Sequence, residues 1–131
     1  MIRALDQLGD GESKAGTKVA PKEATSTPKS RRLLCVACGS PVTTTLSRTE
    51  VSGQHHHVFC NPAGLVFEIG CFDDVPGAAA AGPPENFFSW FPGYAWRVAI
   101  CRNCLAHLGW AYGEDDFWGL ILDRLVEEDE D

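Results

Sequence analysis

The sequence contains one short motif twice, as Cys35-Val36-Ala37-Cys38-Gly39 and as Cys101-Arg102-Asn103-Cys104. Two residues between paired cysteines form a tight turn that aims both sulfurs at one ion, and the amides of the turn reduce the thiolate charge. Gly39 stands where such a turn often needs a positive φ. We therefore predict one structural, tetrahedral zinc site with the ligands Cys35, Cys38, Cys101 and Cys104.

Other interpretations of the cysteines fit less well. A redox C-x-x-C pair stands alone before a helix, disulfides need an oxidising compartment, and an iron–sulfur cluster suits the paired spacing less than zinc does. Cys60 and Cys71 lie in apolar segments and are expected to be small buried hydrophobic residues. His55, His56 and His57 are expected to form a solvated or partly stacked run, because a strand points alternate residues to opposite faces.

Length and charge limit the classes of function. The 131 residues allow one small domain, which would gain stability from a bound metal ion because its hydrophobic core is small. Residues 1–32 hold seven Lys or Arg and four Asp or Glu, a net charge of +3, so the remainder of this −7 chain carries −10. An acidic domain repels phosphate backbones, so we expect no nucleic-acid partner. No stretch approaches the ~18–20 apolar residues of a membrane span, and no signal peptide is evident, which favours a reducing, cytoplasmic location.

The composition divides the chain into three parts. Residues 1–31 are rich in Gly, Ser, Thr, Lys, Pro and Ala, which predicts a disordered leader. Residues 32–126 form the predicted domain, and residues 127–131 form an acidic tail.

Within the domain the pattern predicts a mainly β fold. Segments 42–47, 55–60, 65–72 and 96–101 are rich in β-branched, aromatic or apolar residues and are expected to be strands. The Pro and Gly residues of segment 73–86 predict a long loop. Segment 117–128 has apolar residues at helical spacing, although Gly119 weakens that prediction.

Three of the four tryptophans are clustered. Trp90 and Trp96 flank Phe91-Pro92-Gly93-Tyr94, where Pro-Gly favours a type II turn. Trp110 and Tyr112 are two residues apart, so they share one face of a strand. From this pattern alone the rings can be an aromatic box beside the metal or ordinary core residues.

Longer stretches of the sequence resemble a known family. They are residues 88–96 (FSWFPGYAW), Cys101-x-x-Cys104-x-x-His107-x-Gly109-Trp110-x-Tyr112 and residues 117–120 (FWGL), with residues 61–64 (NPAG) and the first cysteine pair in matching order. These motifs are similar to the thalidomide-binding domain of cereblon, the CULT domain, over about residues 33–125. The resemblance implies two small antiparallel sheets that meet at an angle, a β-tent, pinned by zinc near their junction.

The resemblance also implies a site and a function. Trp90, Trp96 and Trp110 would wall a pocket for cyclic imides, and Tyr112 would form its floor. The imide would be the glutarimide of thalidomide-like compounds, or a similar ring at the C-terminus of a damaged protein. Asn61 would border the pocket, and the backbone of Phe88, Ser89 and Trp90 would hydrogen-bond the imide. The expected activity is non-enzymatic binding.

The sequence departs from the family in two respects. Phe88 and Ala63 stand where the vertebrate protein has histidines. The residues before the domain are too few for the domain that docks cereblon to a ubiquitin ligase, so we expect a stand-alone protein of the kind found in bacteria and some eukaryotes, without substrate-receptor activity.

Two alternatives stay open. Residues 101–109 also resemble the zinc knuckle of methionine sulfoxide reductase B, but no cysteine follows Cys104, so Cys60 or Cys71 would have to be the nucleophile. An aromatic cage can also bind methyl-ammonium groups by cation–π attraction, with a carboxylate from Glu114, Asp115 or Asp116 nearby.

Overall fold

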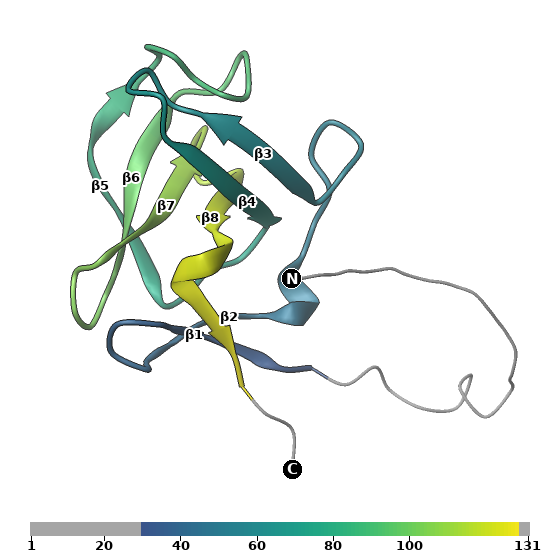
Figure 1. Cartoon of the computed structure of the whole chain (residues 1–131), viewed down its shortest axis with the longest axis vertical. Helices are drawn as coiled ribbons and strands as arrows, with labels where there is room; N and C mark the ends of the chain where they lie inside the picture. The colour runs from purple at the N-terminus through teal and green to yellow at the C-terminus, as the bar shows by residue number, and fades with distance from the viewer. Residues whose placement is uncertain (1–29, 129–131) are drawn as a thin grey trace, which may run out of the picture.

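A computed structural model describes residues 30–128 (Figure 1). The predictions made for residues 1–29 and 129–131 lie outside this part of the chain. The described part contains nine strands and two short 3-10 helices. They are β1 (Arg32–Cys35), β2 (Pro41–Thr44), η1 (Thr45–Ser47), β3 (His56–Cys60), β4 (Val66–Phe72), β5 (Ala78–Glu85), β6 (Trp96–Cys101), β7 (His107–Tyr112), β8 (Phe117–Ile121), η2 (Leu122–Arg124) and β9 (Leu125–Glu127).

The strands form two antiparallel sheets, as predicted. The smaller sheet has the order β2-β1-β9 and the larger has the order β3-β4-β8-β7-β6-β5. The C-terminal segment connects them, because it leaves the larger sheet at β8, turns through η2 and enters the smaller sheet as β9 (Figure 1). Two segments from opposite ends of the domain, β1 and β9, are therefore neighbours.

The larger sheet separates two cores. On one side, residues of both sheets pack together, including Leu33, Phe72, Leu108 and Leu120. On the other side lies an aromatic core that includes Phe91, Tyr112 and Phe117, with the three clustered tryptophans packed against it. Trp118, the fourth tryptophan, belongs to the first core.

Strand β7 contributes to both cores. Leu108 and Ala111 pack in the first core, whereas Trp110 and Tyr112 face the aromatic side. A register shift where β7 pairs with Ala99 and Ile100 inserts an extra residue, which explains why Leu108 and Ala111 share a face although they are three residues apart. The predicted sharing of a face by Trp110 and Tyr112 is thus correct.

Two glycines allow other parts of the chain to pack closely against the backbone, Gly77 beside β2 and Gly119 within β8. A Cβ on Gly77 would lie 2.1 Å from the carbonyl oxygen of Pro41, where the chain crosses β2. A Cβ on Gly119 would lie 2.9 Å from Cγ2 of Ile69 and 3.1 Å from a ring carbon of Tyr112. Gly119 therefore leaves room for the Tyr112 ring beside β8.

The predicted loop at residues 73–86 is wrong, because most of it is strand β5. Its four alanines pair with β6 from Ala78↔Cys101 to Ala81↔Val98, and a register shift follows before Glu85↔Trp96. The shift accommodates Gly82, Pro83 and Pro84. Proline is tolerated there because β5 is an edge strand, whose outer N–H groups have no ladder partner.

The predicted helix at 117–128 is also wrong. Residues Phe117–Ile121 are all buried and form β8, a central strand of the larger sheet. A strand covered on both faces has a continuous apolar run rather than an alternating one, and such a run is easily mistaken for a buried helix. Likewise, the strand predicted at 42–47 ends at Thr44, and Thr45–Ser47 form η1.

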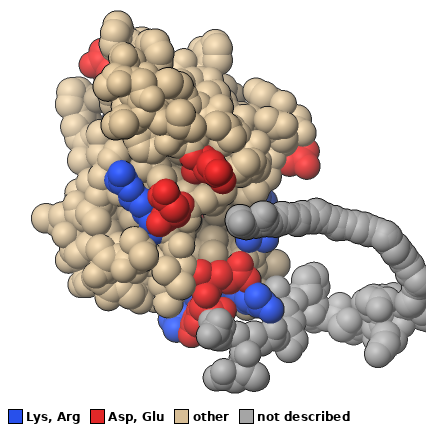
Figure 2. Space-filling view, in the orientation of Figure 1, with Lys and Arg blue, Asp and Glu red and all other residues tan. Residues whose placement is uncertain are grey.

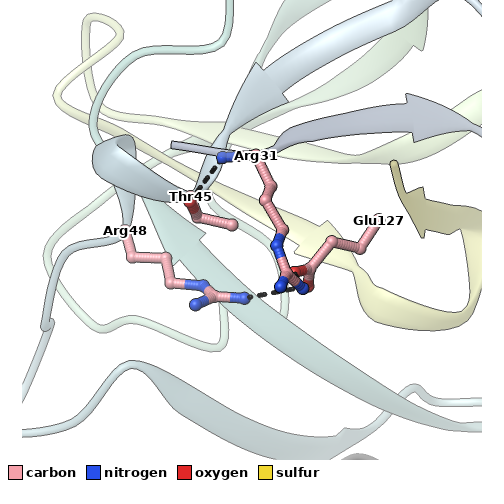
Figure 3. A network of polar contacts seen from close by, with 4 residues as sticks. All are labelled: Arg31, Thr45, Arg48 and Glu127. Atoms are coloured by element: carbon pink, nitrogen blue, oxygen red, sulfur yellow. Dashed lines mark hydrogen bonds and ion pairs between the residues drawn. The ribbon is translucent and has the colours of Figure 1, made fainter. Parts of the chain in front are cut away.

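Ion pairs fasten the two ends of the domain. Arg31 contacts Glu127 at 2.7 Å, Arg48 approaches the same carboxylate at 3.8 Å, and the Arg31 amide donates to the Thr45 hydroxyl (Figure 3). Arg32 forms a second pair, with Glu128. Glu127 and Glu128, assigned to the acidic tail from sequence, thus lie in or beside β9.

Charges are unevenly spread on the surface. In Figure 2 basic and acidic side chains gather around the β1 and β9 end, whereas the upper part of this face is largely uncharged. No helix in the described residues is long and apolar enough to span a membrane.

Candidate metal centre and aromatic cavity

The four predicted metal ligands converge where the two sheets meet. Cys35 ends β1 and Cys101 ends β6, and Cys38 and Cys104 lie in the turns that follow. Their four sulfur atoms all lie within 4.8 Å of one another. It is the one group of three or more His, Cys, Asp or Glu residues in the described chain that is close enough to hold a metal ion.

The spacing of the sulfurs fits a tetrahedral ion. The Cys35–Cys104 and Cys38–Cys101 sulfur distances are both 3.7 Å. Four sulfurs at a Zn–S distance of about 2.3 Å are about 3.8 Å apart along each tetrahedral edge. The cluster can therefore take a zinc ion with little movement, and with four protein ligands the site would be closed to water.

The two cysteine turns have the same hydrogen bonds. The carbonyl of Cys35 accepts from the Gly39 amide at 2.7 Å, and that of Cys101 accepts from the Leu105 amide at 2.9 Å. Gly39 has φ = 80°, which confirms the predicted left-handed position, and Leu105 has φ = 68° at the equivalent place. A side chain in this region costs roughly 1–2 kcal/mol, so the second turn is strained where the first is relaxed.

The surroundings of Cys38 favour its thiolate form. Hydrogen bonds from the Asn103 side chain and from Ser40 lower the pKa of Cys38 to about 6. Asn103 lies between the cysteines of the opposite turn, so the second turn stabilises the thiolate of a cysteine in the first. A thiolate is the form that binds a metal ion.

The aromatic side of the larger sheet contains a cavity of about 300 Å³. Six of the seven residues predicted to bind a ligand line it, and Pro62 and Phe87 line it as well. Ser89 does not. The six are Asn61, Phe88, Trp90, Trp96, Trp110 and Tyr112.

Backbone carbonyls fix the orientation of two of the indole rings. Nε1 of Trp90 donates to the Cys60 carbonyl at 3.2 Å, and Nε1 of Trp96 donates to the Phe87 carbonyl at 2.9 Å. The rings of Trp90 and Trp110 are 4.9 Å apart and nearly perpendicular, at 77°. With their N–H groups already bonded, Trp90 and Trp96 offer the cavity chiefly their apolar faces and edges.

Other rings support these walls. Phe59 stacks on Trp90 at 4.9 Å, and Phe67 meets the edge of Trp110 at 5.5 Å. His107 packs edge-on against Trp110 at 4.9 Å, and burial lowers the pKa of His107. Sequence reasoning missed Phe59 and Phe67, although each lies at an inward position of a correctly predicted strand, where alternation could have identified them.

Ser89 positions the loop rather than lining the cavity. Its hydroxyl lies 2.7 Å from the carbonyl of Tyr94, to which it donates, and accepts from the amide of Phe91 at 3.3 Å. The Tyr94 amide donates to the Phe91 carbonyl, and Gly93 has φ = 92°, as the predicted type II turn requires. The Trp90–Trp96 connection is therefore tightly folded.

The backbone beside the cavity has unused hydrogen-bonding groups. Within the described residues, neither the Phe88 carbonyl nor the Trp90 amide has a hydrogen-bond partner. Phe88 also adopts φ = 56°, which is uncommon for a bulky residue. Strained backbone of this kind often marks a functional site.

Asn61 shapes the opposite border of the cavity. Its side-chain oxygen accepts hydrogen bonds from the amides of Ala63 at 3.0 Å and Leu65 at 2.9 Å, which closes the turn between β3 and β4. The side chain thus holds the turn in which Pro62 also lines the cavity.

The remaining cysteines and histidines lie outside the metal cluster. The predicted burial of Cys60 is wrong, because Phe59 turns inward onto Trp90 and the next residue of the strand must face solvent. Cys71 is buried as predicted, and burial raises its pKa to about 12. His57 is buried and stacks on Phe59, whereas His56 is exposed beside Glu68, so the triplet divides between two faces.

Comparison with known proteins finds relatives that are named cereblon. No family model matches the chain. Cereblon from Danio rerio is 36% identical over 75 residues, which cover 52% of this chain and 17% of the relative. Cereblon from Drosophila melanogaster is 39% identical over 56 residues, covering 41% of this chain and 10% of the relative, and cereblon from Drosophila virilis is 41% identical over 56 residues, covering 41% and 9%. The chain thus spans less than a fifth of the length of these relatives. The similarity confirms the resemblance to cereblon over about half of this chain, and the cysteine cluster within the chain could hold a metal ion.

Proposed function

We propose that this chain is a non-enzymatic binding module whose tryptophan-walled cavity binds a cyclic imide. The observation that carries the proposal is the combination of two unpartnered backbone groups, the Phe88 carbonyl and the Trp90 amide, with three indole rings around one cavity. Glutarimide, a six-membered cyclic imide, is the ligand of this class that we propose. The similarity to cereblon supports the same conclusion.

The chemistry of the ligand fits these groups. An imide presents an N–H between two carbonyls, so it needs an acceptor beside a donor. The Phe88 carbonyl can accept from the imide N–H, and the Trp90 amide can donate to an imide carbonyl. The C–H edges of the saturated ring suit the faces of the indoles. Because backbone groups form these hydrogen bonds with the imide, the identity of the Phe88 side chain does not affect them.

The metal is proposed to be zinc with a structural role. Four thiolates at this spacing favour a tetrahedral, borderline-soft ion. The ligands lie at the junction of the sheets, and no cysteine lines the aromatic cavity. Zinc would therefore stabilise the domain without contacting the imide.

The reductase alternative has little support in the geometry. A nucleophilic cysteine needs access to substrate and a low pKa. Cys71 is buried with its pKa raised to about 12, and the exposed Cys60 does not line the cavity.

The methyl-ammonium alternative lacks a negative charge in the right place. None of the eight residues that line the cavity is charged. Of the acidic residues considered for this role, Asp115 is paired with Arg97 at 3.0 Å. An uncharged imide is the better match.

The partner we propose is therefore a small cyclic imide or a peptide that ends in one. Net charge of −7 disfavours a nucleic-acid partner. Such a ring forms when the side-chain amide nitrogen of Asn or Gln attacks the backbone carbonyl of the same residue. The peptide bond breaks, the following residue leaves as the amine, and a cyclic imide remains at the new C-terminus, so a damaged protein end is one source.

Titration with glutarimide, followed by tryptophan fluorescence, tests the proposal. We expect saturable binding to the wild type and a loss of about tenfold or more in affinity for Trp96→Ala and Trp110→Ala, because each removes a large apolar wall. Leu46→Ala, an exposed position in η1, is the matched control and should bind normally.

N-methylglutarimide provides a second control, on the ligand. It keeps the ring but lacks the imide N–H, so we expect at least tenfold weaker binding. Equal affinity for the two compounds would contradict recognition by the backbone, and the absence of any saturable signal with glutarimide would overturn the proposal.

A further inference from the structure

Two aromatic side chains at the edge of the cavity are not used by the imide. Phe87 and Phe88 both line the cavity, yet they are 69% and 51% exposed. Single exposed apolar residues are common, but two neighbouring phenylalanines beside a cavity form a continuous apolar surface. We call Phe87 and Phe88 the phenylalanine shelf.

The shelf is held in place. The Phe87 carbonyl accepts the Trp96 indole N–H at 2.9 Å, so the shelf is joined directly to a cavity wall. The two phenyl rings have centroids 6.1 Å apart at an angle of 40°, and Phe88 adopts a left-handed backbone. Ser89 fixes the next part of the loop through Tyr94 and Phe91. The exposure of these rings is thus built into the fold.

The surroundings of the shelf determine which chemistry fits it. No charged residue lines the cavity, and the closest preceding charge, Glu85, is exposed and pairs in register with Trp96. An acidic group on the ligand would therefore meet apolar rings and a like charge. The cavity volume of about 300 Å³ also lies at the lower end of the ~300–1,000 Å³ range of sites for drug-sized ligands, which are larger than a single six-membered ring.

We propose that the phenylalanine shelf is a second subsite, which binds an aromatic or branched apolar group attached to the imide ring. The inference rests on the proposed function. For a peptide that ends in a cyclic imide, the group is the side chain of the residue before the imide. For a small molecule, it is an aromatic substituent. The shelf would make the module selective for apolar over acidic neighbours of the imide.

A comparison of ligands with and without the apolar group tests the shelf. We would measure calorimetric affinities for glutarimide and phenyl-substituted glutarimide, and for short peptides that end in an imide after Phe, Gly or Glu. We expect the phenyl compound and the Phe peptide to bind about tenfold tighter than glutarimide and the Gly peptide, because burial of part of a ring gives a gain of this size. The Glu peptide should bind more weakly than the Gly peptide.

Phe87→Ala should remove most of this preference, with a loss of about tenfold in affinity for phenyl-substituted glutarimide and a much smaller loss for unsubstituted glutarimide. The Phe87 carbonyl that holds Trp96 is retained in this variant. Phe88→Asn should act in the same direction, because asparagine tolerates the left-handed backbone. Val66→Ala is the matched control, because Val66 is 65% exposed and does not line the cavity.

The outcomes separate the two proposals. Tight glutarimide binding without any preference for the phenyl group, or an equal loss for both ligands in Phe87→Ala, would overturn the shelf and leave the imide cavity standing. A preference seen with the compounds but not with the peptides would identify free small molecules as the ligand source. Failure of every ligand to bind the wild type would overturn both.

Discussion

The metal cluster and the aromatic cavity are constructed in opposite ways. The cluster has four ligands from two short turns, and the two turns have equivalent hydrogen bonds, from the Gly39 amide to the Cys35 carbonyl and from the Leu105 amide to the Cys101 carbonyl. The cavity draws its walls from β6, β7, the β3–β4 turn and the loop after β5, with no repeated motif. Each cysteine turn is therefore determined by local sequence, although the cluster joins two sheets. The cavity forms only when several elements of the larger sheet and its loops are held in place.

Strand β6 connects the two regions. Trp96 begins the strand at the cavity, and Cys101 ends it at the metal cluster. The strand pairs with β7, which carries Trp110 and Tyr112. The comparison can therefore be tested by perturbing one region and measuring the other.

Removal of the metal should have the largest effect. Chelation, or Cys38→Ser, should abolish cooperative thermal unfolding and glutarimide binding together, because metal binding supplies folding free energy, on the order of 10 kcal/mol in zinc-finger peptides. Metal content is measured by elemental analysis and binding by calorimetry. Cys60→Ser, an exposed cysteine outside the cluster, should keep both. Full glutarimide affinity in metal-free protein would show that the cavity stands without the cluster.

Two glycine variants should give smaller effects that differ between the regions. Gly77→Ala would place a Cβ 2.1 Å from the Pro41 carbonyl oxygen at the sheet junction, and backbone has little room to move, so we expect a loss above about 3 kcal/mol. Gly119→Ala would meet side chains at 2.9 and 3.1 Å, which can shift at a cost of about 1–3 kcal/mol. Denaturant unfolding measures both.

The binding readout distinguishes these variants further. Gly119→Ala should displace the Tyr112 ring and weaken glutarimide binding even where the protein is fully folded. Folded Gly77→Ala at low temperature should bind normally. Weaker glutarimide binding by Gly77→Ala than by Gly119→Ala would mean that the sheet junction, rather than the position of Tyr112, determines the cavity geometry.

The sequence predicted the two regions unequally for a physical reason. The cluster needs only cysteine spacing and a left-handed position at Gly39, which are local properties. The correct grouping of Trp90, Trp96 and Trp110 came from resemblance, because the pattern alone allowed an ordinary core. The strands that carry these residues were predicted in part. The wrong predictions, at residues 73–86 and 117–128, concern strands that depend on pairing with segments distant in sequence.

Strands β5 and β8 show what the sequence could not reveal. The alanines of β5 have low intrinsic strand propensity, and their pairing with β6 is a tertiary effect. Strand β8 is apolar at every position because both of its faces are covered, so the two-residue period is absent. Phe87 and Pro62 were missed as cavity residues because neither belongs to a regular element with a readable face.

The smallest predicted effects concern the two cysteine turns. Gly39→Ala meets no atom within 4 Å, so only its left-handed φ should matter, with a loss of about 1 kcal/mol. Leu105→Gly relieves the same conformation and should stabilise the protein by up to about 1 kcal/mol, since Leu105 is 66% exposed and has little packing to lose. Urea midpoints with metal-saturated protein measure both. A destabilised Leu105→Gly would mean that the two turns are less alike than their hydrogen bonds indicate.

The hydrogen bonds of the two indole N–H groups affect how tightly a small molecule can be held. The bonds from Trp90 to Cys60 and from Trp96 to Phe87 order these rings before any ligand arrives. Little side-chain rotamer entropy then remains to be lost on association, which otherwise costs about 0.5–1.5 kcal/mol for each side chain that becomes fixed. A ligand with few atoms can thus reach a high affinity per atom, and enthalpy rather than entropy is expected to dominate its binding to such a preformed apolar site.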